Sequence, residues 1–243
     1  MKKTYGLLGR DIGYSFSKGY FADKFEKENL NCEYNNFDIK QINEVKEIFK
    51  NSNIKGLNVT IPYKEEIISY LDELDPIAKE IGAVNVIKFS SNQRLVGYNS
   101  DYYGFTESLK PLLNNNIKKA IILGTGGASK AIAYSLTQLG IAFSFISRNP
   151  DFNEMSYGDL TEDIINSHKL IINCTPLGTH PNIENHPQIP YEYITKNHVL
   201  YDLIYNPDET AFMKKGLQKG AKVSNGLKML ILQAENAWEI WNS

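Results

Sequence analysis

The feature that most constrains the fold is a short apolar segment followed at once by a glycine cluster. Residues 120–123 read Ala-Ile-Ile-Leu, and residues 124–127 read Gly-Thr-Gly-Gly. A wholly apolar run of this length is typical of a strand buried on both faces of a parallel sheet. Apolar residues between 132 and 139 then recur at helical spacing, and Gly140 supplies a stop. Strand, glycine turn and helix in this order predict a βαβ unit within an α/β fold.

The same alternation of strands and helices extends along the rest of the chain. The sequence predicts further strands at 4–8, 33–39, 55–61, 84–89, 141–146, 169–173 and 198–203. It predicts helices at 18–28, 42–49 and 101–113, and another that begins at Pro62, since proline is favoured in a first helical turn. A last amphipathic helix covers 225–242, and its apolar stripe has to be buried. We therefore expect two α/β domains, of residues 1–101 and 102–224, with the C-terminal helix in 225–243 returning to the first domain.

Composition narrows the functional classes. Of the 243 residues, 42% are hydrophobic and 22% charged, which are ordinary values for a globular protein. The formal net charge of −2 offers no basic surplus for a phosphate backbone, so we expect no nucleic-acid partner. No apolar run approaches the ~20 residues of a membrane span and no signal peptide is visible, so we expect no membrane association and a cytoplasmic location. The two cysteines and four histidines lack metal-ligand spacing, so we expect no metal.

The glycine cluster has the pattern of a dinucleotide-binding turn. Gly124 permits the tight turn, Gly126 allows close approach of a pyrophosphate, and the next helix offers free N–H groups at its N-terminus. Ser129 stands where a third glycine is usual, and the alternative is an ordinary glycine-rich turn. The end of the next strand carries Arg148 and no acidic residue. This favours a 2′-phosphate and hence NADP, although a surface arginine is the alternative.

Polar residues of the first half suit a small polyhydroxylated ligand. Strand alternation places Asn58 and Thr60 on one face, which would otherwise be a polar face in water. Lys64 follows Pro62 at the predicted helix start, where the helix dipole favours a neutral amine suited to acid–base chemistry. A solvated surface lysine is the alternative. Asp101 precedes a predicted helix, either as an N-cap or as a charge partner for Lys64.

Two serines near the N-terminus form a further candidate. In an extended segment Ser15 and Ser17 point the same way, and two converging hydroxyls can donate to a carboxylate. The alternative is helix capping, with Ser17 as the favoured cap.

Taken together, these motifs resemble the shikimate dehydrogenase family over nearly the whole chain. The matching blocks, in the family's order, are Ser15-Phe16-Ser17, Asn58-Val59-Thr60-Ile61-Pro62-Tyr63-Lys64, Gly82-Ala83-Val84-Asn85, Asn99-Ser100-Asp101, Gly124-Thr125-Gly126-Gly127-Ala128, Asn173-Cys174-Thr175-Pro176-Leu177-Gly178, Asp202-Leu203-Ile204-Tyr205-Asn206-Pro207 and Asn225-Gly226-Leu227-Lys228-Met229-Leu230. The chain departs from the family's usual residues at Tyr14, Lys18, Phe21-Ala22, Ser100 and Ser147-Arg148-Asn149.

The resemblance implies an α/β substrate domain followed by a Rossmann-like NADP-binding domain. It implies NADP-dependent, reversible reduction of 3-dehydroshikimate to shikimate in aromatic amino-acid biosynthesis, with Lys64 and Asp101 as the catalytic pair. The implied substrate-binding residues are Ser15, Ser17, Asn58, Thr60, Asn85, Tyr205 and Gln233. The implied cofactor-binding residues are Gly124, Gly126, Gly127, Ala128, Arg148, Thr175 and Gly226. We expect a monomer or a homodimer.

Three other functions stay open at this point. A quinate/shikimate dehydrogenase would use the same site and is distinguished by kinetics with quinate and with NAD. Another reductase with the same two-domain plan, such as a methylenetetrahydrofolate dehydrogenase, fits less well, because Ser15, Ser17 and Asn85 suit a small polar acid. An NADP-binding sensor without activity is distinguished by the absence of shikimate-dependent NADPH formation.

Overall fold

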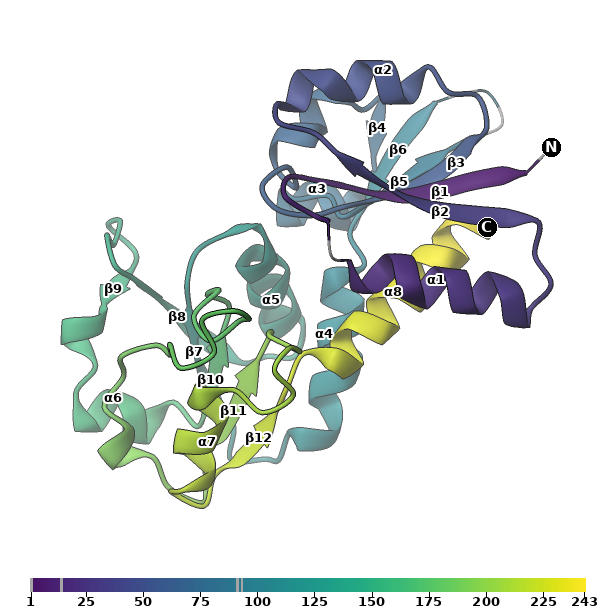
Figure 1. The fold of residues 1–243 in the computed structure, drawn as a ribbon. Coiled ribbons are helices and arrows are strands. Elements are labelled where there is room, and N and C mark those ends of the chain that lie inside the picture. Colours follow the sequence, from purple (N-terminus) through teal and green to yellow (C-terminus); the bar gives the residue numbers. More distant parts are fainter. Residues whose placement is uncertain (1, 14, 91, 93) are drawn as a thin grey trace. The chain divides into compact units, whose positions relative to one another are not determined.

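The structure, a computed structural model, describes residues 2–13, 15–90, 92 and 94–243 and divides into two compact units. Unit 1 comprises Met1–Ser100 and Ala234–Ser243, and unit 2 comprises Asp101–Gln233. Each unit contains one sheet with helices packed on it (Figure 1). The predicted α/β class is therefore confirmed. The departure at Tyr14 lies outside the described residues.

Unit 1 contains a mixed six-stranded sheet in the order β2-β1-β3-β5-β6-β4. Parallel pairing joins β1 to β2 and β3, and β4 to β6, whereas β5 runs antiparallel to β3 and β6. The strands are β1 (Lys3–Gly9), β2 (Cys32–Asp38), β3 (Ile54–Val59), β4 (Glu73–Leu74), β5 (Val86–Phe89) and β6 (Leu95–Tyr98).

Both faces of this sheet are covered. Leu7 and Leu8 are adjacent on β1, so they point to opposite faces, and each belongs to a separate apolar cluster. One face packs residues of α2 (Val45–Phe49) and α3 (Pro76–Ile81). The other packs α1 (Phe16–Lys27) and the last turns of α8 (Leu227–Asn242). A short 3₁₀ helix, η1 (Ile42–Glu44), leads into α2.

The helix expected from Pro62 is wrong. Residues 61–65 form turns, and a 3₁₀ helix, η2 (Glu66–Tyr70), follows them. Its N-cap position is occupied by Glu65, so Lys64 lies ahead of the helix and not in its first turn. The helix-dipole argument for a neutral Lys64 amine therefore loses its premise.

Unit 2 contains a six-stranded sheet in the order β12-β11-β10-β7-β8-β9, and every pair in it is parallel. When the strands of the unit are numbered from β7 and the sheet is read from β9 to β12, the order is 3-2-1-4-5-6, the order of the Rossmann fold. The strands are β7 (Lys119–Leu123), β8 (Ala142–Ser147), β9 (Met155–Ser156), β10 (Leu170–Asn173), β11 (Val199–Asp202) and β12 (Lys222–Ser224). The helices are α4 (Asp101–Leu109), α5 (Gly127–Gln138), α6 (Glu162–Ser167) and α7 (Ala211–Leu217), with 3₁₀ turns η3 (Lys110–Leu112), η4 (Tyr157–Asp159) and η5 (Tyr191–Tyr193).

The central strands of unit 2 are apolar on both faces, as the sequence predicts. Ile121 and Ile171 belong to one apolar cluster, whereas Ile122 and Ile172, their neighbours on β7 and β10, belong to the other. All four side chains are fully buried. The short apolar runs thus form strands that are buried on both faces, as is typical of a parallel sheet.

Helix α8 contributes to the cores of both units. Met229 in its first turns packs with the Phe105 cluster of unit 2. Ala234, Ala237 and Trp241 pack with the Tyr5 cluster of unit 1. The expected return of the C-terminal helix to the first part of the chain is therefore confirmed.

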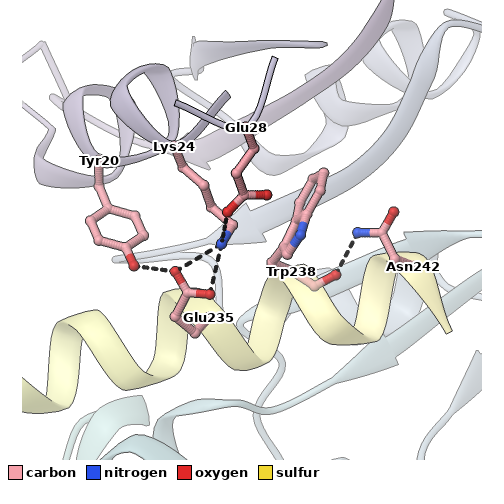
Figure 2. A network of polar contacts seen from close by, with 6 residues as sticks. All are labelled: Tyr20, Lys24, Glu28, Glu235, Trp238 and Asn242. Carbon is pink, nitrogen blue, oxygen red and sulfur yellow. Dashed lines mark hydrogen bonds and ion pairs between the residues drawn. The ribbon is translucent and has the colours of Figure 1, made fainter. Parts of the chain in front are cut away.

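In unit 1 a polar network also fastens α8 to α1 (Figure 2). Glu235 accepts hydrogen bonds from the Tyr20 hydroxyl and from the Lys24 ammonium group, the latter at 2.9 and 3.2 Å. Lys24 also pairs with Glu28 at 2.9 Å, so its three N–H donors meet two carboxylates. Further along α8, the Trp241 indole N–H donates to the Ile87 carbonyl at 3.1 Å.

Candidate active site

The glycine turn connects β7 to α5 at the carboxyl end of the sheet in unit 2. Gly124 has a φ of +100°, a conformation that other residues rarely adopt. At Gly126 an added Cβ would meet no described atom within 4 Å, so the backbone faces open space. Because α5 begins at Gly127, the free N–H groups of its first turn lie beside this opening. Ser129, in place of a third glycine, folds its hydroxyl back onto the Gly126 carbonyl at 2.6 Å and leaves the turn open.

Thr175 lies next to this turn. It follows β10, and its methyl group is 3.2 Å from the position that a Cβ on Gly124 would take. Strands β7 and β10 flank the point where the strand order reverses, which is where ligands bind in sheets of this kind. The Thr175 hydroxyl donates to Asn173 Oδ1 at 2.6 Å and accepts from the Leu177 N–H at 3.3 Å. Its side chain therefore organises the loop after β10.

A buried carboxylate, Asp202, holds the neighbouring loop. It ends β11, is fully buried, and accepts from Asn173 Nδ2 at 3.0 Å, the Ile204 N–H at 3.1 Å and the Thr210 hydroxyl at 2.6 Å. Burial raises the Asp202 pKa to about 6. The three hydrogen-bond donors lower the pKa because they favour the carboxylate, but their effect is smaller than that of burial. Sequence reasoning did not single out Asp202 by its chemistry, although an acid that ends an apolar strand is a usable signal.

Gly226 and the loop that contains Tyr205 form one corner of unit 2. The Gly226 N–H donates to the Ile204 carbonyl at 2.9 Å. A Cβ at Gly226 would lie 2.1 Å from the Leu203 carbonyl oxygen, so this close approach requires glycine. Tyr205 is half-buried next to Ile204. The structure thus brings two of the predicted residues, Tyr205 and Gly226, into the same corner.

Arg148 directly follows β8, as expected, and its side chain is exposed. Its charge acts on Tyr157, where it opposes the rise in the tyrosine pKa that burial causes. Within residues 2–13, 15–90, 92 and 94–243, no hydrogen bond or ion pair joins the Arg148 guanidinium to another side chain. An exposed guanidinium at this strand end suits an anionic ligand group.

In unit 1, Asn58 and Asn85 are connected parts of a buried polar network. Asn58, at 5% exposure, approaches the Asn85 carbonyl with Nδ2 at 3.4 Å. The Asn85 side chain accepts from the Ser100 N–H at 2.6 Å and donates to the Ser100 hydroxyl at 3.0 Å. Ser100 directly precedes Asp101, the first residue of α4. The predicted amides therefore help to fix the backbone that leads to the predicted acid.

The prediction that Ser15 and Ser17 share an extended segment is wrong, because only Ser15 has an extended backbone. Helix α1 begins at Phe16, and Ser15 is its N-cap, accepting from the Lys18 N–H at 3.4 Å. Ser17, which we favoured as the cap, is instead buried in the first turn. The N-cap preference of serine explains the outcome, because the hydroxyl satisfies an N–H that the helix leaves free.

Lys64 is half-buried in the turns that follow β3 and Thr60. Its carbonyl accepts from the Val84 N–H at 2.8 Å. The preceding residue, Tyr63, is fully buried, and its hydroxyl donates to the Ile39 carbonyl at 2.9 Å. The backbone of Lys64 is thus fixed by its own hydrogen bond and by the buried residue that precedes it. Lys64 belongs to unit 1 and Asp101 to unit 2, so their pairing stays a prediction.

Gln233 lies on α8 beside a close helix–helix approach in unit 2. A Cβ on Gly104 of α4 would be 3.0 Å from the Gln233 backbone nitrogen and 2.6 Å from the Met229 carbonyl oxygen. Gln233 itself is 8% exposed. Glycine at 104 therefore sets the distance between α4 and the part of α8 that carries Gln233.

Tyr34 on β2 is a residue that the sequence analysis missed. Its hydroxyl donates to Asn58 Oδ1 at 2.8 Å. Burial raises its pKa strongly. The sequence pattern of a tyrosine in a strand is the same as that of an ordinary core residue. No signal in the sequence alone would therefore have pointed to the contact between Tyr34 and Asn58.

Two features are absent from the described part of the chain. No group of three or more His, Cys, Asp and Glu side chains is placed to hold a metal ion there. No helix in the same residues has both the length and the apolar character needed to cross a bilayer.

A Rossmann-ordered sheet with an open glycine turn at its switch point, joined to a separate α/β unit, defines a two-unit protein of the dinucleotide-binding class. The profile of the shikimate dehydrogenase substrate binding domain matches residues 7–87. The chain belongs to the shikimate dehydrogenase family, which confirms the resemblance seen in its motifs.

Three relatives illustrate this membership. The chain is 38% identical to the shikimate dehydrogenase (NADP(+)) of Clostridium botulinum, over 98% of this chain and 96% of the relative. The crystal structure of shikimate dehydrogenase from Aquifex aeolicus is 36% identical, with a TM-score of 0.88, over 99% and 92% of the two chains. The structure of shikimate 5-dehydrogenase from Thermus thermophilus, in complex with NADP(H) and shikimate, is 29% identical, with a TM-score of 0.87, over 98% and 93%.

Proposed function

We propose that this protein is a shikimate dehydrogenase, which reduces 3-dehydroshikimate to shikimate reversibly with NADPH. The observation that carries the proposal is the 38% identity to a shikimate dehydrogenase (NADP(+)) over 98% of the chain. The chain also carries Lys64 and Asp101, the two residues that the resemblance implies as the catalytic pair.

The residues of unit 2 fit a dinucleotide. The open backbone at Gly126, together with the first turn of α5 from Gly127 and Ala128, would hold the pyrophosphate. Arg148 would hold the 2′-phosphate, and Thr175 and Gly226 would line the path of the cofactor. When bound, the nicotinamide supplies the hydride that is exchanged with carbon 3 of the substrate.

The remaining chemistry belongs to the chain's own side chains. Lys64 donates a proton to the oxygen that develops negative charge during reduction, and it removes that proton in the reverse direction. Asp101 orients the Lys64 amine and balances its charge. Ser15 and Ser17 bind the substrate carboxylate. Asn58, Thr60, Asn85, Tyr205 and Gln233 bind the ring oxygens, so that the reacting carbon is held at a fixed position.

The test is an absorbance assay of reduced cofactor with shikimate or quinate and with NADP or NAD. We expect shikimate with NADP to be the best pair. Substitution Lys64→Ala should lower kcat by at least about a hundredfold with little change in KM for shikimate, the low end for loss of a general acid–base group. Lys79→Ala, an exposed lysine of α3, is the matched control and should keep full activity. Near-normal turnover of the Lys64 variant would exclude that residue as the proton donor.

A further inference from the structure

The buried hydroxyl of Tyr34 connects residues from three elements of unit 1. Tyr34 on β2 donates to Asn58 on β3 at 2.8 Å, and the Ser17 hydroxyl on α1 is near enough to act on the tyrosine pKa. Their exposed fractions are 5% for Tyr34, 5% for Asn58 and 7% for Ser17. Groups this deeply buried depend on protein partners for their hydrogen bonds, so each contact constrains the orientation of both side chains.

The position of this hydroxyl is set by packing. The Tyr34 ring stacks on the fully buried Phe21 ring, with centroids 4.7 Å apart and planes 11° apart. Both rings belong to the apolar cluster that also contains Trp241. The phenol oxygen is therefore held in place by the core and acts as a fixed donor toward β3.

The direction of the hydrogen bonds determines which atom of Asn58 can reach a ligand. A phenol carries one proton, and the Tyr34 proton goes to Asn58 Oδ1. Oδ1 is thus committed to Tyr34, and Nδ2 takes the other side of the amide. Among the described residues Nδ2 meets only the Asn85 carbonyl, at 3.4 Å, so one of its two N–H groups is left for a ligand oxygen.

We propose that Tyr34 is a positioning residue, which holds the Asn58 amide so that it presents an N–H group, and not its carbonyl, to a hydroxyl or carbonyl oxygen of the substrate. The proposal rests on the proposed function, because it takes shikimate and 3-dehydroshikimate as the ligands of Asn58. The 3.4 Å contact to Asn85 is long for a hydrogen bond, so it is a weak determinant of the amide orientation without Tyr34.

The experiment uses Tyr34→Phe, which keeps the ring and its stacking on Phe21 and removes only the hydroxyl. The matched control is Tyr5→Phe, since Tyr5 is a buried ring of the same cluster. Affinity for shikimate is measured by calorimetry on protein saturated with NADPH. Shikimate and NADPH are both the reduced forms, so they do not react with each other. Steady-state kcat and KM for shikimate and NADP are measured in parallel.

We expect Tyr34→Phe to raise both Kd and KM for shikimate about fivefold, the effect of weakening one hydrogen bond, with kcat and KM for NADP changed by less than about twofold. Tyr5→Phe should change none of them. In an Asn58→Ala background, Tyr34→Phe should have no further effect on the Kd or KM for shikimate, because Tyr34 acts through Asn58. The alanine also removes Asn58 Oδ1, the acceptor that Tyr34→Phe alone would leave without its donor.

Three results would overturn the proposal: unchanged shikimate affinity in Tyr34→Phe, an effect that persists in the Asn58→Ala background, or an equal rise in KM for NADP. The proposed function fails separately if the unmodified protein shows no shikimate-dependent turnover, and the calorimetric series still tests Tyr34 in that case. Failure of the unmodified protein to bind shikimate would overturn both.

Discussion

The buried carboxylate of Asp202 gives the protein a pH-dependent stability that can be calculated. Burial raises its pKa from 3.8 to about 6. A raised carboxyl pKa means that the folded state prefers the protonated form. The stabilising contribution is therefore complete below pH 3.8 and is lost as the pH rises through about 6. The full difference corresponds to about 3 kcal/mol, and the part expressed between pH 7 and pH 5 is about 1 kcal/mol.

Asp202→Asn isolates this contribution. The asparagine carbonyl can keep the donors from Asn173 and Ile204, and its NH₂ group can donate to Thr210, as a protonated Asp202 would. The variant does not titrate at this position. Its free energy of unfolding minus that of the unmodified protein should therefore fall by about 1 kcal/mol as the pH is lowered from 7 to 5.

The assay is urea unfolding followed by circular dichroism at several pH values. Buried His168 and His198 have pKa values lowered chiefly by burial, so they act in the opposite direction, and stability from them is lost as the pH falls through their unfolded pKa. Both histidines are present in both proteins, so their contribution cancels in the difference. A difference that stays constant between pH 5 and pH 7 would refute the reasoning.

Other predictions follow from single contacts. Gly226→Ala should cost at least about 2 kcal/mol in unfolding free energy, because its Cβ would lie 2.1 Å from the Leu203 oxygen, and a melting temperature equal to that of the unmodified protein would contradict this. Arg148→Gln should raise KM for NADP about tenfold and leave KM for NAD unchanged, measured with shikimate at saturation, whereas a parallel rise in both would exclude a 2′-phosphate contact. Glu235→Gln should cost about 1 kcal/mol in urea unfolding, since Lys24 keeps Glu28, while exposed Glu239→Gln should cost nothing measurable; equal values for the two would show that the network on α8 adds no stability.

The parts of the fold that the sequence predicts well are those with a strong local pattern. The apolar run before Gly124 and the helix after it form β7 and α5 where the pattern places them. The two-residue strands β4 and β9 were not predicted, because two residues are too few to show alternation. The helix expected at Pro62 failed because proline is equally at home in turns, and the turns here are fixed by the buried Tyr63, a long-range contact.

In the candidate site, too, the features with a local sequence pattern were predicted and those that depend on distant residues were not. Glycines with an enforced conformation or close approach, such as Gly124 and Gly226, lie where the motifs predict them. Tyr34 and Asp202 act through hydrogen bonds to residues 24 and 29 positions away, so their partners emerge only once the strands are paired. Local sequence patterns carry information about propensity and not about such distant partners.

The division of unit 1 into two stretches of chain has a consequence for biosynthesis. The stretch Ala234–Ser243 supplies Ala234, Ala237 and Trp241 to its core, yet it is synthesised only after the whole of unit 2. The contiguous Rossmann sheet is complete once β12 has been made, whereas the N-terminal sheet lacks part of its core until α8 follows, because Tyr5 and Phe25 pack in one cluster with Trp241. We therefore expect the sheet that is made first to finish folding after the one that is made second.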